Sequence, residues 1–327
     1  TLCVRIMRSL HINAVAYLIL PVFWATQLNI CNLKTDEQQA CAISLLRMIA
    51  IWGAKWHPFF MTYRPEIHDE LVSVANALAD VARAVILPHF RSAGLSAENK
   101  LTTGFDPVTV ADKAAEQAMC DLLAQMRPDD AILGEEYGAK SGTSGLNWVL
   151  DPIDGTRGFV SGTPTWGVLI AVGDDTGPQI GVIDQPYIGE RFIGTPQGAN
   201  FVGPHGEGAI QTRLPRPLSE ATVFTTFPEV GSLTERAGFE AVAEKALLTR
   251  YGMDCYAYAL LAAGHVDLVI EASLNSYDIQ GPIGLIHGAG GIVTDWQGGP
   301  AHNGGRALAA ANPDIHAEAL AILREFP

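Results

Sequence analysis

The residues whose types and spacing favour chemistry gather in one run, which reads Asp-Pro-Ile-Asp-Gly-Thr over positions 151–156. Two carboxylates three residues apart follow the apolar segment Trp148–Leu150 directly. Clustered oxygen ligands at the end of a strand suit hard divalent cations. The Gly-Thr step after them is predicted to open a helix, whose free backbone N–H groups suit a phosphate. A metal and a phosphate held at one point predict metal-assisted phosphoryl transfer.

Four acidic residues form the candidate metal site: Glu135, Asp151, Asp154 and Asp278. Each stands at the end of a strand-like segment or the start of a helix. Taken singly, each has a structural explanation as a turn residue, a strand end or a helix N-cap. Taken together, they predict a site for two Mg²⁺ ions, which share three or four carboxylates and often a backbone carbonyl, here that of Ile153.

Thr156 adds a hydroxyl to this run. A water that attacks phosphorus must lose a proton, and a hydroxyl paired with a carboxylate can orient the water and help to accept that proton. We therefore predict that Thr156 pairs with Glu135. The alternative is that Thr156 is only an early residue of its helix.

Composition limits the classes of partner. The chain has 327 residues, enough for two domains or one large one, and its 48% hydrophobic content allows a substantial core. A formal net charge of −14 argues against nucleic acid and anionic membrane, because both need a basic face. The five cysteines form no close pair, which argues against a disulfide framework or zinc site and indicates a reducing, cytoplasmic compartment.

Residues 1–60 differ in character from the remainder. Their apolar stretch 14–25 follows Arg5 and Arg8 but is too short for a membrane-spanning helix. A signal peptide is the alternative, although no small-residue cleavage site is evident. We expect an atypical N-terminal extension, non-native or disordered, with the native protein starting at Met61.

From residue 66 onward, hydrophobic periodicity predicts an α/β protein in two halves. In the metal- and phosphate-binding half, 61–214, helices at 67–87 and 112–126 pack on an antiparallel sheet of strands 131–133, 148–150, 166–172, 180–183 and 191–193. In the substrate-specificity half, 215–327, strands 222–226, 266–271 and 292–294 alternate with helices 233–247, 254–263, 278–289 and 315–326. The first half is thus expected to be α+β and the second α/β.

Three blocks of this sequence resemble the signature blocks of the inositol monophosphatase superfamily: Gly134-Glu135-Glu136, the run 151–156, and Tyr277-Asp278. The six-residue run is highly specific, and the resemblance extends from Glu66 to the C-terminus. It implies a Mg²⁺-dependent, lithium-sensitive phosphatase with two or three ions per site. It also implies the layered αβαβα sandwich of the inositol monophosphatase and fructose-1,6-bisphosphatase type, usually as a homodimer.

The resemblance also implies a role for each matching residue. Glu135, Asp151 and the Ile153 carbonyl resemble the ligands of the first metal, and Asp151, Asp154 and Asp278 those of the second. Asp112 resembles the acidic residue that supports a further, weaker metal. Together with Glu135 and Thr156, Asp112 is an expected catalytic residue. Gly155 and Thr156 resemble the N–H donors to phosphate.

A departure from the family pattern indicates the substrate. The family commonly has a small residue where Asp254 stands, and the segments 252–258 and 157–162 resemble the branch that hydrolyses histidinol phosphate. Inositol phosphatases usually have Trp where Tyr277 stands, which puts inositol in doubt. Arg157, Asp254 and Glu271 are the expected substrate residues, with Glu271 seven residues before Asp278 as the family spaces its substrate-hydroxyl ligand.

The chemistry of the ester agrees with this expectation. Histidinol phosphate carries an ammonium group beside the phosphorylated alcohol, whereas an inositol ring carries only hydroxyls. Asp254, near Glu271, is expected to pair with the ammonium. Inositol would leave that carboxylate desolvated and unpaired, at a cost of about 1–3 kcal/mol. The alternative for Asp254 is an N-cap of the helix 255–263, and one residue can hold both roles. Asp267 is expected to orient its neighbours.

The sequence therefore predicts a phosphomonoesterase that converts L-histidinol phosphate to L-histidinol and phosphate in histidine biosynthesis. One alternative keeps the chemistry with another small ester, such as inositol 1-phosphate, a sugar bisphosphate or a 3′-phosphorylated nucleotide. Another is a non-catalytic, metal-dependent sugar-phosphate binding protein. Thr156 and Glu135 argue against the last, because a pure binder needs no pair to activate water.

Overall fold

The computed structural model describes residues 65–93, 98–99, 107–227, 229 and 231–326. The chain divides into the units Thr1–Phe60 and Met61–Pro327, and the second holds all of the described residues. The predicted N-terminal extension therefore lies outside the described residues. Among the helices that are described, none is long and apolar enough to span a membrane.

Eight strands form the larger sheet, in the order β10 (Gly206–Ile210), β9 (Gly198–Gly203), β8 (Glu190–Thr195), β7 (Gly177–Gln185), β6 (Gly167–Asp174), β5 (Asn147–Asp154), β3 (Ala131–Gly134) and β4 (Gly138–Lys140). The neighbours run antiparallel except for β3 and β5, which are parallel. Because parallel strands end at the same edge, this pairing places the ends of β3 and β5 side by side.

Two long helices cover one face of this sheet: α4 (His68–Ile86), preceded by the short helix η3 (Pro65–Ile67), and α5 (Val110–Met126). Helix α4 buries Leu71, Val74 and Leu78, whose spacing of three and four residues puts them on one side. They join Trp148 and Val168 of the sheet in one apolar cluster. A two-stranded ribbon of β1 (Glu98–Asn99) and β2 (Pro107–Val108) precedes α5.

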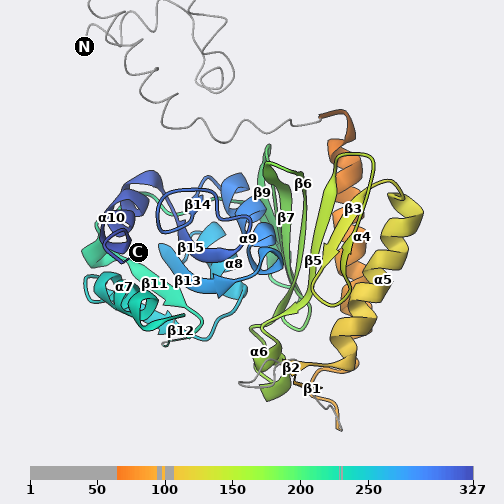
Figure 1. Ribbon diagram of the computed structural model, residues 1–327, viewed down its shortest axis with the longest axis horizontal. Helices are drawn as coiled ribbons and strands as arrows, with labels where there is room; N and C mark the ends of the chain where they lie inside the picture. Colours follow the sequence, from red (N-terminus) through yellow and green to blue (C-terminus); the bar gives the residue numbers. More distant parts are fainter. Residues whose placement is uncertain (1–64, 94–97, 100–106, 228, 230, 327) are drawn as a thin grey trace, which may run out of the picture. The chain divides into compact units, whose positions relative to one another are not determined.

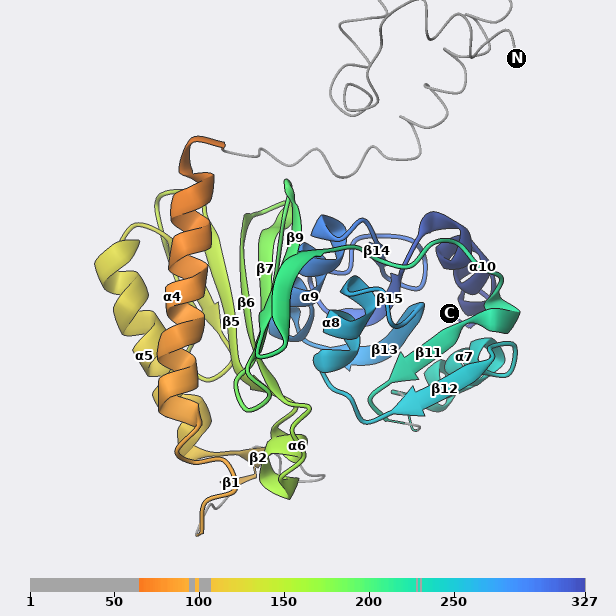
Figure 2. The ribbon, with the colours of Figure 1, turned by 180° about the vertical axis from the view of Figure 1, so that it is seen from behind.

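The second sheet has five strands, in the order β12 (Leu248–Tyr251), β11 (Thr222–Thr225), β13 (Leu268–Leu274), β15 (Gly305–Ala310) and β14 (Ile292–Thr294). Helices α8 (Tyr256–Ala262) and α9 (Ser276–Gly288) lie between the two sheets, and α7 (Leu233–Ala243) and α10 (Pro313–Leu323) cover the outer face (Figures 1 and 2). The segment from 211 to the short helix η4 (Leu218–Glu220) connects the two sheets. The resulting αβαβα sandwich confirms the predicted fold.

Glycines let α9 lie directly on the larger sheet. A Cβ on Gly284 of the helix would stand 2.5 Å from the backbone nitrogen of Gly181 in β7. A Cβ on Gly194 of β8 would stand 2.3 Å from the Cα of Leu285. Backbone thus meets backbone with no side chain between, which fixes the position of α9 relative to the larger sheet.

Some elements differ from the sequence prediction. Strand β15 was not predicted, because its sequence Gly-Arg-Ala-Leu-Ala-Ala favours a helix. In the structure the sheet overrides that preference, since small side chains on both faces of β15 fit between the two helical layers. Strands β4, β9, β10 and β12 were also not predicted. Helix α7 ends at Ala243 rather than at residue 247, since the chain then turns to pair β12 with β11.

Candidate active site

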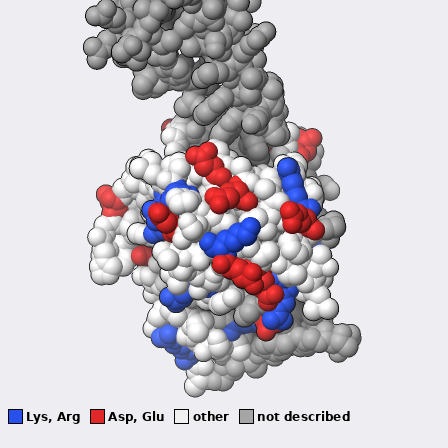
Figure 3. Space-filling view, turned by 90° about the vertical axis from the view of Figure 1, so that its left-hand side faces the viewer, with Lys and Arg blue, Asp and Glu red and all other residues white. Residues whose placement is uncertain are grey.

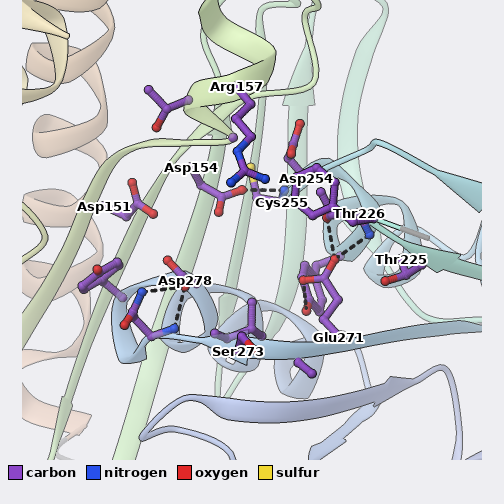
Figure 4. A pocket seen from close by; sticks show the side chains of 18 of the residues that line it. Asp151, Asp154, Arg157, Thr225, Thr226, Asp254, Cys255, Glu271, Ser273 and Asp278 are labelled. Carbon is purple, nitrogen blue, oxygen red and sulfur yellow. Dashed lines mark hydrogen bonds between the residues drawn. The ribbon is translucent and has the colours of Figure 1, made fainter. Parts of the chain in front are cut away.

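A cavity of about 460 Å³ opens where elements of the two sheets meet. The end of β5 and the start of α6 (Thr156–Ser161) supply one side, and the ends of β11 and β13 with the starts of α8 and α9 supply the other (Figure 4). It is lined by every predicted metal, phosphate and substrate residue except one: Glu135, Asp151, Ile153, Asp154, Gly155, Thr156, Arg157, Asp254, Glu271 and Asp278. Asp112 is the exception.

Asp151, Asp154 and Asp278 form the closest carboxylate group in this cavity. Each offers one oxygen, and these oxygens lie within 4.8 Å of one another. In a regular strand, residues three apart point to opposite faces, but the pairing of β5 with β6 shifts register between Asp151 and Asp154. Asp278 comes from the first turn of α9, where it accepts a hydrogen bond from the N–H of Asn275 at 2.6 Å.

Burial and mutual repulsion hold these groups toward the protonated form. Burial, and then the charges of Glu135, Asp154 and Asp278, raises the pKa of Asp151 well above its ordinary value. Burial, and then the charge of Asp254, does the same to the pKa of Asp154. Burial raises the pKa of Asp278 to about 7.

The donor set of the cavity fits a divalent cation. Among the described residues that line it, seven are acidic and one, Arg157, is basic. Carboxylates crowded in this way are stable in their ionised form only when positive charge lies among them. Oxygen ligands of this kind are those that Mg²⁺ prefers. The prediction of a cation site thus agrees with the charges, and the ligand assignments remain predictions.

Thr156 makes a different contact from the one predicted. Its hydroxyl donates to the carbonyl of Ile153 at 3.1 Å. A threonine hydroxyl has one proton, so in this structure that proton is not donated to Glu135. The predicted pair therefore requires the hydroxyl to rotate. The Ile153 carbonyl keeps a second lone pair for another ligand.

Gly155 makes the turn from β5 into α6. Its φ of 83° lies in the left-handed region, and a Cβ there would stand 2.7 Å from Cγ of Asp254. Glycine therefore meets two demands at this position, the backbone angle and the close approach of a carboxyl group. The turn presents the start of α6 to the cavity, with Asp254 packed against it.

Asp254 does not cap its helix, so the alternative considered for it is wrong. Residue 255 is the N-cap of α8, and no side chain caps that helix. Instead Asp254 has a left-handed backbone, with φ of 46°, and its Oδ2 accepts a hydrogen bond from Thr165 Oγ1 at 2.8 Å. Burial raises the pKa of Asp254, while Thr165 and the charge of Arg157 lower it.

The residue after Asp254 supports the metal cluster. The N–H of Cys255 donates to Oδ2 of Asp154 at 2.6 Å. The Cys255 thiol itself is buried, and burial raises its pKa well above the ordinary value. One peptide unit thus links the candidate substrate carboxylate with a candidate metal ligand.

Glu271 is held from two sides. Its Oε1 accepts hydrogen bonds from the N–H and the hydroxyl of Thr226 at 3.0 and 2.5 Å. Its Oε2 accepts one from the Tyr258 hydroxyl at 3.1 Å. Burial, and then the charge of Asp254, raises the pKa of Glu271. The structure thus brings Glu271 and Asp254 to one cavity, as the sequence predicted.

Two other acidic residues lie away from the cavity wall. Asp112 is the N3 residue of α5, where its Oδ2 accepts hydrogen bonds from the N–H and hydroxyl of Thr109, the actual N-cap. The helix predicted over 112–126 therefore starts two residues earlier, at Val110, and Thr109 rather than Asp112 is its N-cap. Burial raises the pKa of Asp112 to about 6, with Glu135 among its neighbouring charges. Asp267 accepts hydrogen bonds from Arg213 and from the N–H of Thr222, an orienting role as predicted.

Carboxylates gathered in one cavity beside the turn into α6 suit metal-assisted hydrolysis. The chain is a phosphoric monoester hydrolase. More narrowly, the chain belongs to the inositol monophosphatase family. The model of that family matches residues 67–326. Both the class and the family predicted from the sequence are confirmed.

Relatives and solved structures agree with this assignment. The bifunctional phosphatase IMPL2, chloroplastic, of Arabidopsis thaliana is 40% identical over 266 residues, which cover 78% of this chain and 75% of that protein. A histidinol-phosphatase of Streptomyces coelicolor is 32% identical over 268 residues, covering 80% of this chain and 99% of the relative. An inositol monophosphatase from Zymomonas mobilis matches with a TM-score of 0.70 at 38% identity, covering 80% of this chain and all of the other.

Proposed function

We propose that this chain is a Mg²⁺-dependent phosphatase that hydrolyses L-histidinol phosphate to L-histidinol and phosphate, a step of histidine biosynthesis. The observation that carries the proposal is Asp254, a carboxylate in a left-handed backbone, packed against the turn at Gly155 and inside the acidic cavity. A half-buried carboxylate beside a phosphate ester favours an ester that carries a cation. Relatives named histidinol-phosphatase support the same substrate.

The candidate metal ligands are Glu135, Asp151, the Ile153 carbonyl, Asp154 and Asp278, with Asp112 supporting a further, weaker ion. What bound Mg²⁺ would supply is positive charge on the phosphoryl oxygens and a water of lowered pKa. The residues hold the phosphate between this cluster and the N–H groups of Gly155 and Thr156. Such positioning is most of what phosphoryl transfer requires.

Thr156 and Glu135 act on the attacking water. The Thr156 hydroxyl turns from the Ile153 carbonyl toward the water, and Glu135 accepts the proton that the water loses. The leaving alkoxide then takes a proton from solvent.

The substrate is held on the other side of the cavity. Its ammonium group lies beside the phosphorylated carbon, and Asp254 accepts a charge-assisted hydrogen bond from it, with Glu271 close by. Arg157, on the first turn of α6, contacts the phosphate from the outer side. We place the protein in the cytoplasm as a homodimer.

An inositol ester is the second candidate, favoured by the likeness to an inositol monophosphatase structure. The deciding experiment measures phosphate release from L-histidinol phosphate and from myo-inositol 1-phosphate, with Mg²⁺ and with EDTA. We expect Mg²⁺-dependent release with a clear preference for histidinol phosphate. Preference for the inositol ester would overturn the substrate, and no release from either would overturn the proposal as a whole.

The variant Asp254→Asn makes this test specific to the ammonium group. It keeps the shape that packs against Gly155 and removes the charge. Losing a charged hydrogen bond predicts a drop in kcat/KM of about 10- to 100-fold on histidinol phosphate. On glycerol 2-phosphate, which has no ammonium, the loss should be much smaller. Equal losses on both esters would refute the ammonium pairing.

A further inference from the structure

A second residue with a strained backbone lines the same cavity. Among the described residues, three that are not glycine have a positive φ: Arg91, Asp254 and Ser273. Two of the three, Asp254 and Ser273, line the cavity. Ser273 has a φ of 63°, a region that L-residues other than Asn and Asp seldom adopt, and such strain gathers at functional sites.

A break in the sheet produces this conformation. Strand β13 pairs regularly with β15 up to Glu271 and resumes only at Leu274, so the register shifts across Ser273. Irregularities of this kind re-aim a side chain next to an active site. Ser273 is exposed, and its hydroxyl makes no hydrogen bond to the side chains or backbone of the described residues. The hydroxyl is therefore available to a ligand.

Ser273 and an aromatic ring both line the cavity. Figure 4 shows Ser273 between Glu271 and Asp278, across the cavity from Arg157. Phe227, which follows β11, also lines the cavity and is 43% exposed. The guanidinium of Arg157 lies 4.8 Å from the centre of its ring. Beyond Asp254, the cavity lining thus includes a hydroxyl on β13 and an apolar ring just after β11, the latter reaching Arg157.

We propose that Ser273 and Phe227 form the subsite for the heterocycle of the leaving group, an inference that rests on the proposed substrate. With the phosphate at α6 and the ammonium at Asp254, the imidazole of histidinol phosphate is the part left to contact this wall. Each imidazole tautomer has one donor and one acceptor nitrogen, and a serine hydroxyl serves either. The ring of Phe227 packs against the flat heterocycle.

Two variants separate the hydroxyl from the backbone strain. Ser273→Ala removes the hydroxyl and keeps the strain, whereas Ser273→Gly removes both, because glycine adopts a positive φ freely. The subsite predicts that both variants lose selectivity. The melting temperature of Ser273→Gly should stay within about 2 °C of wild type or rise. If only the strained backbone mattered, Ser273→Ala would keep the selectivity and Ser273→Gly alone would lose it, which would refute a contact by the hydroxyl.

The readout is the ratio of kcat/KM on two esters. L-Histidinol phosphate carries the ammonium and the imidazole, and O-phosphoethanolamine carries the same ammonium without the heterocycle. Losing one hydrogen bond predicts that Ser273→Ala and Ser273→Gly lower the ratio by about 3- to 10-fold, mainly through KM. Phe227→Leu should lower it as well. Ser92→Gly, an exposed serine outside the cavity, is the control and should leave it unchanged.

The outcomes also distinguish this subsite from the substrate proposal. Wild-type protein that fails to hydrolyse histidinol phosphate refutes both. Wild-type protein that hydrolyses it, with an unchanged ratio in Ser273→Gly, refutes the subsite alone. Equal losses on the two esters would likewise refute it, since the contact would then not be with the heterocycle.

Discussion

At the scale of single residues, Asp154 shows how one carboxylate is divided between two tasks. Its Oδ2 accepts the Cys255 N–H at 2.6 Å, and one of its oxygens belongs to the group shared with Asp151 and Asp278. The protein N–H fixes the orientation of the side chain before any cation binds. Such prior orientation is what a metal ligand requires, because a rotating carboxylate would lose entropy on binding.

Replacing Asp154 tests this role directly. Asp154→Asn keeps the shape and an acceptor for Cys255 but removes a charge from the cluster. Residues that only orient metal ligands cost 10- to 100-fold when changed, so we expect a loss of more than about 100-fold in turnover. Stability in EDTA should be kept or raised, because a crowded, buried carboxyl has been removed. Near-wild-type turnover would contradict the proposed metal site.

Sequence predicted the carboxylates at this scale because they stand in dense local patterns. It did not predict their supports. Thr165 lies 89 positions before Asp254 and Thr226 lies 45 before Glu271, and no local pattern joins them. Nor did it single out Ser273, since the strain there arises from the pairing of β13 with β15, a contact between distant segments.

At the scale of elements, the placement of α9 sets the active site. Helix α9 supplies Asp278, and β5 of the larger sheet supplies Asp151 and Asp154. The glycine contacts between α9 and strands β7 and β8 therefore determine how far apart these carboxylates stand. The sequence predicted α9 as residues 278–289 but not that its glycines face a sheet, because both partners of such a contact must be known.

Gly284→Ala tests this contact. Alanine favours a helix by about 1 kcal/mol over glycine, yet its Cβ would stand 2.5 Å from backbone. Overpacking should prevail, so we expect the free energy of unfolding to fall by about 1–3 kcal/mol. Activity at low Mg²⁺ concentration should also fall, because the carboxylates no longer stand at the distance that binds the ion. The melting temperature and the half-saturating Mg²⁺ concentration report both effects.

Gly208→Ala is the matched control, because a Cβ at Gly208 of β10 would meet nothing within 4 Å. We expect its stability to stay within about 0.5 kcal/mol of wild type. Equal stability of the Gly284 and Gly208 variants would show that α9 can move away from the sheet without cost.

At the scale of the whole molecule, charge is the main variable. The chain carries a formal charge of −14, but Figure 3 shows acidic and basic side chains interspersed on the face it presents. The active-site cavity, by contrast, holds seven carboxylates and one arginine among its described lining residues. Folding therefore brings like charges together where function needs them, at a cost to stability that depends on pH.

The sign of that dependence follows from the pKa values. Asp278 has a folded pKa of about 7 against an ordinary 3.8, and those of Asp151 and Asp154 are also raised. The folded state then binds more protons than the unfolded state, so stability falls as pH rises through these values. His287 and His316, lowered to about 4 by burial, act in the opposite sense only below pH 6.5.

Thermal melting from pH 6.5 to 8.5 in EDTA isolates the carboxylates. We expect the free energy of unfolding to fall by about 1.4 kcal/mol per pH unit for each carboxyl still protonated in the folded state. The melting temperature should fall with it. Saturating Mg²⁺ should flatten or reverse the slope, and Asp154→Asn should reduce it. A melting temperature that stays level or rises in EDTA would contradict the raised pKa values.

The glycine contacts of α9 also bear on how this protein selects among esters. A hinge between the sheets would have to slide α9 over β7 and β8, and backbone in direct contact with backbone has no soft side chains to absorb such a movement. We therefore expect the cavity to keep one shape before and after an ester enters. Selection among esters would then depend on fit to a preformed site at the first encounter, and not on a closure of the site that only the correct ester induces.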